Sequence, residues 1–144
     1  MDGDLIMKKV CVIGSFRFYS AMLNIGRMLE SAGVDCWIPQ PSKYRDPDEP
    51  SKFLPLSQTD PREVVLKDAF ECTVRCFRKI DESDIVYVLD KGGYMGKSTL
   101  LDMGYAYAKN KAIYALEPID DLAVMSLIKA VIPPARLIQI AQQG

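Results

Sequence analysis

Residues 84–116, DIVYVLDKGGYMGKSTLLDMGYAYAKNKAIYAL, decide the fold. The run at 84–89 is apolar and β-branched, which predicts a strand buried on both faces. Ser98 or Thr99 can cap a helix that continues to about Lys109. Residues 112–116 repeat the apolar pattern and predict the next strand. A strand, a helix and a strand in this order predict a right-handed parallel βαβ unit.

In the rest of the chain, short β-branched runs alternate in the same way with segments whose apolar residues recur at helical spacing. The expected strands are residues 9–13, 34–38, 84–89, 112–116 and 137–141. The expected helices are residues 20–31, 61–80, 98–109 and 120–131. Asp60 and Pro61 fit the N-cap and first position of the second helix. The proline-rich segment 39–60 predicts a long loop, and loops of that length are usually functional or mobile.

Five strands alternating with helices predict a three-layer α/β domain that is flavodoxin-like or Rossmann-like. We expect one domain over residues 1–144, with about five parallel strands in the order 2-1-3-4-5 and helices on both faces. In that order the first and third strands are neighbours, and ligands bind at their carboxyl ends. The loops 14–19 and 90–98 border this crevice, so the sequence predicts a small-molecule site between them.

Composition excludes several classes of function. The net charge is −1, which gives no electrostatic footprint for nucleic acid. No apolar run approaches a membrane span, and residues 1–9 lack the apolar region of a secretory leader. We therefore expect a cytoplasmic protein with no nucleic-acid or membrane partner.

The chain contains no histidine, which removes histidine-dependent catalysis and histidine-ligated metals. Cys11 and Cys36 lie in strand-like runs and are expected to be buried. Cys72 and Cys76 would share one helix face, but no second cysteine pair completes a zinc site. Reduced thiols are the better interpretation, and we expect neither a metal nor a cofactor.

The loop after the first strand, GSFRFYS, suits an anionic or aromatic ligand. A glycine allows close backbone approach, amides before a helix attract anions, and an arginine can pair with phosphate. The candidate binding residues are Gly14, Ser15, Phe16, Arg17 and Tyr19. The structural alternative is an ordinary turn, with its aromatic residues packed inward and its arginine solvated.

The loop after the third strand combines glycines with a cation and two hydroxyls at a helix start. Its candidate binding residues are Asp90, Gly92, Gly93, Gly96, Lys97, Ser98 and Thr99. Asp90 could bind sugar hydroxyls or cap loop amides. The loop nearly matches a P-loop, but that motif requires glycine where Lys91 stands.

Asp102 lies one turn into the helix that follows and should point toward the same crevice. One interpretation is a carboxylate that the helix dipole stabilises. The other is a catalytic nucleophile facing a sugar C1′, where positive charge develops as the glycosidic bond breaks.

The order strand-GSF, then SDIVYVLD, a glycine loop and STLLDMGYAYAKNKAIYAL resembles the nucleoside 2-deoxyribosyltransferase family. That family includes relatives that hydrolyse deoxynucleoside 5′-monophosphates. Its motif runs approximately A-D-x-V-x-x-x-L-D-G and G-T-x-x-E-x-G-Y-A-x-A-x-G-K, which residues 83–112 follow. The resemblance implies a homo-oligomer and a carboxylate that attacks C1′ of a nucleoside or nucleotide.

The resemblance assigns the nucleophile to Asp102, where the family has the longer glutamate. The family's acid on the preceding helix falls on Cys76, for which Asp68, Glu71 or Asp81 could substitute. These departures leave a second hypothesis open, a nucleotide-binding module without turnover. A phosphate-transferring P-loop protein is the third.

Overall fold

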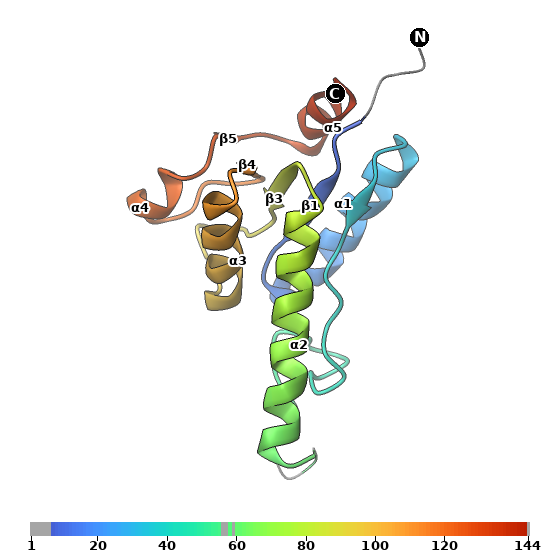
Figure 1. The fold of residues 1–144 in the computed structure, drawn as a ribbon, viewed down its shortest axis with the longest axis vertical. Helices are drawn as coiled ribbons and strands as arrows, with labels where there is room; N and C mark the ends of the chain where they lie inside the picture. Colours follow the sequence, from blue (N-terminus) through green and yellow to red (C-terminus); the bar gives the residue numbers. More distant parts are fainter. Residues whose placement is uncertain (1–6, 56–57, 59, 144) are drawn as a thin grey trace.

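The computed structural model describes residues 7–55, 58 and 60–143. Their core is a five-stranded parallel sheet in the order β2-β1-β3-β4-β5, so the predicted fold class is confirmed. The strands are β1 (Val10–Ile13), β2 (Cys36–Trp37), β3 (Ile85–Val88), β4 (Ala112–Ala115) and β5 (Ala130–Val131). The helices are η1 (Phe16–Phe18), α1 (Tyr19–Ser31), α2 (Arg62–Asp81), α3 (Lys97–Ala108), α4 (Leu122–Met125) and α5 (Pro134–Gln142) (Figure 1).

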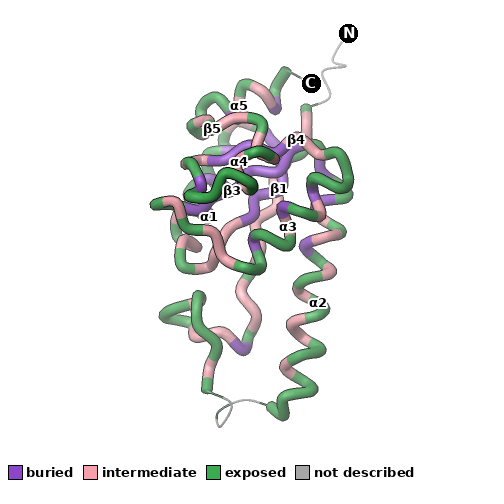
Figure 2. Tube along the Cα trace, turned by 90° about the vertical axis from the view of Figure 1, so that its left-hand side faces the viewer, coloured by how far each residue is buried: buried purple, intermediate pink, exposed green. Residues whose placement is uncertain are grey.

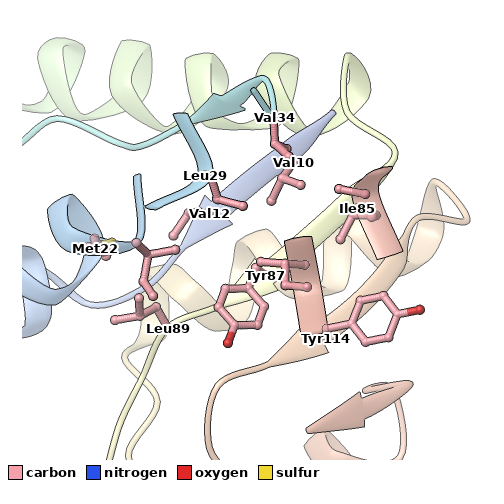
Figure 3. Close-up of a cluster of buried hydrophobic side chains, with 12 residues drawn as sticks. Val10, Val12, Met22, Leu29, Val34, Ile85, Tyr87, Leu89 and Tyr114 are labelled. Atoms are coloured by element: carbon pink, nitrogen blue, oxygen red, sulfur yellow. The ribbon is translucent and has the colours of Figure 1, made fainter. Parts of the chain in front are cut away.

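Alternate residues of each central strand face two separate apolar layers. Val12 and Tyr87 belong to the cluster that α1 and α5 cover, together with Leu89 (Figure 3). Ile13 and Val88 point the other way, into the cluster that α2 and α3 cover. A strand buried on both faces requires continuous apolar sequence, which is why VCVI and IVYV identify the two central strands.

The last strand was predicted in the wrong place. Residues 137–141 form part of α5, and the fifth strand is the two-residue β5. Pro134 occupies the start of α5, where its missing N–H costs nothing, and Leu137 and Ala141 are buried at a helical spacing of four. The predicted helix 120–131 is reduced to α4, which Asp121 caps by accepting a hydrogen bond from the Val124 amide.

Two predicted caps are also wrong. The N-cap of α2 is Pro61 rather than Asp60, and no side chain caps it. The N-cap of α3 is Gly96, so Ser98 and Thr99 lie inside the first turn of the helix. At Gly96 the start of α3 lies directly against Ser15, whose hydroxyl accepts a hydrogen bond from the Gly96 amide.

Helix α2 extends well past the sheet, and its first half lies beside the segment that follows β2 (Figures 1 and 2). Its predicted apolar side is therefore only partly buried. Cys76 and Ile80 reach the core, whereas Phe70 is 67% exposed and Val64 is 43% exposed. The projecting half of α2 forms a wall above the carboxyl ends of the strands.

Candidate functional site

A cavity of about 800 Å³ lies at the carboxyl ends of β1 and β3. Its walls are the loop after β1, the start of α3, the middle of α2, and the segment between β2 and α2. This is the switch point of a doubly wound sheet, where neighbouring loops diverge to opposite faces. The cavity is within the size range of small-molecule sites.

The two loops that border the switch point are joined by one buried carboxylate, Asp90. It is fully buried and accepts hydrogen bonds from the Ser15 amide at 2.7 Å and the Ser15 hydroxyl at 3.1 Å. The Ser15 hydroxyl in turn accepts from the Gly96 amide at 3.1 Å. Burial raises the pKa of Asp90, although the hydrogen bonds and the Arg17 charge oppose the shift. Asp90 holds the two cavity loops in register rather than lining the cavity itself.

Glycine is required at two positions of this arrangement. A Cβ on Gly14 would lie 2.7 Å from the Leu89 carbonyl oxygen, and one on Gly96 would lie 2.6 Å from the Ser15 hydroxyl. The two loops approach too closely for any side chain at these points.

The remaining glycines of the second loop face away from the cavity. Gly92 and Gly93 have positive φ angles, at which a Cβ is strained. The Gly92 amide donates to the Glu117 carboxylate, and Gly93 pairs with Ile119 near the end of β4. Because the Gly92 amide donates to Glu117 and the Gly93 carbonyl accepts from the Asp120 amide, the loop is held by residues after β4 and does not form the phosphate cradle of a P-loop.

Asp102 lines the cavity from the second turn of α3 and is mostly buried. Burial raises the pKa of its carboxyl from 3.8 to about 7, and a hydrogen bond from Cys76 works in the opposite direction. The pKa of Cys76 is itself raised far above its ordinary value by its hydrogen bond with Cys11, by burial and by the charge of Asp102. Cys76 therefore remains a thiol that can donate to Asp102.

The segment after β2 forms the wall opposite α3. It contains a short antiparallel pairing between Arg45 and Phe53, and Ser42 donates a 2.5 Å hydrogen bond to Asp68 on α2. Tyr44 is buried, and its hydroxyl donates to Asp60. Residues 39–55 of the predicted loop therefore have a defined structure that covers one side of the cavity.

Among the described residues, the charges that line the cavity are mainly positive. The cations are Arg17, Arg45, Lys52, Arg75 and Lys97. The single lining carboxylate is Asp102. The cavity is therefore positively charged although the chain as a whole has a net charge of −1, and this local excess of cations favours an anionic ligand.

The cavity brings together most of the residues proposed from the sequence. Those that line it are Gly14, Ser15, Phe16, Arg17, Gly96, Lys97, Ser98, Thr99 and Asp102. Tyr19, Asp90, Gly92 and Gly93 are not among the lining residues, although Tyr19 contacts Phe16 edge-on. Of the four candidates for the acid on α2, only Cys76 lines the cavity, and Asp81 instead pairs with Tyr105 and Lys109.

Sequence reasoning missed the contributions of the end of β2, of the segment after it and of α2, which include Trp37, Arg45, Phe53, Cys72 and Arg75. The length of the loop was the available signal, but it identified no particular residue. Within the described part of the chain, no group of three or more cysteine, aspartate or glutamate side chains is arranged to hold a metal ion. The described helices include none that is long and apolar enough to cross a bilayer.

No family model matches this sequence, and no curated protein matches it. Several solved structures, however, are similar to this chain in fold. A conserved protein from Enterococcus faecalis V583 is 17% identical, with a TM-score of 0.53 over 95% of this chain and 98% of the other. A 2-deoxyribosyltransferase from Bacillus psychrosaccharolyticus is 13% identical, with a TM-score of 0.59 over 90% of each chain.

A third similar structure is the CMP N-glycosidase BcmB from Clostridium botulinum, which is 15% identical. Its TM-score is 0.50 over 92% of this chain and 96% of that chain. The fold implied by the motif in residues 83–112 is therefore the fold that this chain has. At these identities the comparisons establish the fold and leave the reaction to the site.

Proposed function

We propose that this chain is a divergent member of the nucleoside 2-deoxyribosyltransferase family, acting on the N-glycosidic bond of a nucleoside or its 5′-monophosphate. The observation that carries the proposal is Asp102, a mostly buried carboxylate directed into a cation-lined cavity. The similar structures include a 2-deoxyribosyltransferase and a CMP N-glycosidase, which supports the same chemistry.

In the proposed reaction the ionised Asp102 carboxylate attacks C1′ of the sugar. The C1′–N bond breaks, its electron pair leaves with the base, and the base takes up a proton. Water then attacks C1′ and releases Asp102, or a second base does so and gives a new nucleoside. Burial raises the pKa of Asp102 to about 7, so about half of the carboxylates are ionised at neutral pH.

The start of α3 and the loop after β1 suit a 5′-phosphate. Ser98 and Thr99 lie in the first turn of α3, where the helix dipole favours an anion, and Lys97 supplies a charge. Arg17 lines the same cavity from the other loop. These groups favour the 5′-monophosphate over the free nucleoside.

The test is incubation of the purified protein with nucleosides and nucleoside 5′-monophosphates of the ribo and deoxyribo series, with free base measured by chromatography. Release of base supports the proposal. Tight binding of the same nucleotides by calorimetry without release favours a binding module instead. That outcome has a physical basis, because Asp102 is one methylene shorter than the glutamate of the family motif.

We also propose that the protein self-associates through the outer face of α2 and α3. Large apolar side chains are exposed along this face, with Phe70 67% exposed and Leu101 61% exposed. Leu101 also lines the cavity, so a second copy seated here would cover the cavity mouth.

Phe70→Glu is expected to convert a dimer or larger species into a monomer, because it places a charge in the buried centre of the interface. Sedimentation velocity measures the change. Met28→Glu on α1 is the matched control, because Met28 is also exposed but lies on the other side of the sheet. A wild-type monomer, or equal effects of the two changes, contradicts the proposal.

A further inference from the structure

Arg45 is held on the cavity wall by its own small antiparallel pairing. Arg45 and Phe53 lie opposite one another, flanked by hydrogen bonds from Asp46 N to Lys52 O and from Leu54 N to Tyr44 O, both 2.8 Å. Residues directly opposite in an antiparallel pair project to the same face. The side chains of Arg45 and Phe53 therefore both reach the cavity.

The Arg45 guanidinium is fixed between two aromatic rings. Its central carbon lies 4.4 Å from the centre of the Phe53 ring and 4.6 Å from that of Phe16, which comes from the loop after β1. Its Nη1 donates to the Pro50 carbonyl at 2.9 Å. Two rings and one hydrogen bond orient a planar group whose other donors are not used by these contacts.

Within the part of the chain that the structure describes, Arg45 lacks the carboxylate partner that a half-buried cation ordinarily has. Burial lowers the pKa of its guanidinium, and among the described residues neither Arg45 nor Arg75 forms an ion pair. Arg75 lines the cavity from α2, and its charge and that of Arg45 both act on the Cys72 thiol between them in the lining. Lys52 also lines it, but Lys52 pairs with Glu49 at 3.0 Å. Two unneutralised guanidinium groups thus face the ligand space.

The charge of the cavity exceeds what a monophosphate would balance. One phosphate carries a charge of about −2 at most, and the start of α3 with Lys97 and Arg17 already provides for it. Arg45 and Arg75 belong to the other walls, formed by α2 and the segment before it. A volume of about 800 Å³ leaves room for a ligand longer than a nucleoside monophosphate.

We infer that Arg45 and Arg75 form a second anion-binding subsite, so that the ligand is a nucleotide with a second anionic group, of which a nucleoside 5′-diphosphate is the simplest. This inference rests on the nucleotide cavity of the proposed function. It does not require turnover. Its readout is binding, so a protein that binds but never releases base still tests it.

The experiment measures binding of AMP, ADP, CMP and CDP to the full chain by calorimetry. Each diphosphate is expected to bind about tenfold or more tightly than its monophosphate, the scale of one charge-assisted hydrogen bond. Arg45→Gln should remove that preference, because it weakens diphosphate binding about tenfold more than monophosphate binding. Lys43→Ala is the matched control, because Lys43 is exposed nearby and is not among the residues that line the cavity.

A thermal melt of each variant separates lost binding from lost folding, and Arg45→Lys, which keeps the charge, should retain part of the preference. Equal affinities of wild type for mono- and diphosphates overturn the inference. So does an Arg45→Gln variant that weakens both classes alike, because Arg45 would then bind the only phosphate. Binding of free pyrophosphate as tight as that of ADP would also overturn it, since the ligand would not be a nucleotide.

Discussion

The Asp102→Asn variant is expected to lose base release by at least ~1,000-fold while becoming more stable than the wild type at pH 8. Loss of a catalytic nucleophile typically removes several orders of magnitude in rate. The side chain keeps its shape, and its amide oxygen can still accept the hydrogen bond from Cys76. The variant therefore removes the charge and little else.

The stability gain follows from the direction of the pKa shift. Burial raises the pKa of Asp102 in the folded state from 3.8 to about 7. The carboxyl group costs nothing below about pH 4, where it is protonated in both the folded and the unfolded state; the cost grows as the pH rises from about 4 to about 7 and is complete above that. At pH 8 the ionised form costs up to about 4 kcal/mol, on the scale of 1.36 kcal/mol for each pKa unit. Asparagine avoids this cost, so its advantage should be large at pH 8 and absent near pH 4.

Two measurements check this prediction. Urea unfolding of both proteins at several pH values gives the free-energy difference, and base release by wild type across pH 5–9 should rise with a midpoint near the pKa of about 7. Asp102→Glu is the control that restores an ionisable group. If Asp102→Asn released base at the wild-type rate, Asp102 would not be the nucleophile. If the stability difference between the two proteins did not change with pH, the Asp102 carboxyl would not have the raised pKa that burial gives it.

The arrangement of the central strands could be predicted because VCVI and IVYV are apolar at every position, as strands buried on both faces must be. Helices between successive strands then predict parallel pairing, and the order 2-1-3-4-5 is one that doubly wound sheets commonly adopt. The fifth strand could not be predicted, because two residues carry no periodicity. The apolar residues of α5 gave a strand-like run, and only packing against the sheet reveals that Leu137 and Ala141 lie on one helix face.

The candidate site was predictable to the extent that it depends on local sequence. The loops after β1 and β3 contain glycines and hydroxyls next to helix starts, and topology brings them together. The wall containing Arg45 depends on contacts between residues distant in sequence, such as Arg45 with Phe16. No local pattern marks those contacts. The same limit applies to Asp90, whose role as an anchor depends on Ser15, 75 positions away.

The Asp90→Ala variant is expected to lower base release by about 100-fold and the free energy of unfolding by roughly 2–4 kcal/mol. The Ser15 amide and hydroxyl lose their shared acceptor in a fully buried position, and a buried donor without a partner is costly. The Ser15 hydroxyl also holds the Gly96 amide, so the start of α3 loses its connection to the loop after β1. A displacement of about 1 Å there misaligns the sugar with Asp102.

The matched control for Asp90→Ala is Asp84→Ala, at the opposite end of β3. Asp84 is exposed and accepts a 2.9 Å hydrogen bond from the Lys9 amide, so its loss should cost under about 1 kcal/mol and leave base release unchanged. Asp90→Asn keeps one acceptor oxygen and should recover part of the rate, which a purely destabilising change would not do. Steady-state kinetics at a temperature where every variant is folded distinguishes the two effects. An Asp90→Ala protein that keeps the wild-type rate would show that the two loops hold their positions without this carboxylate.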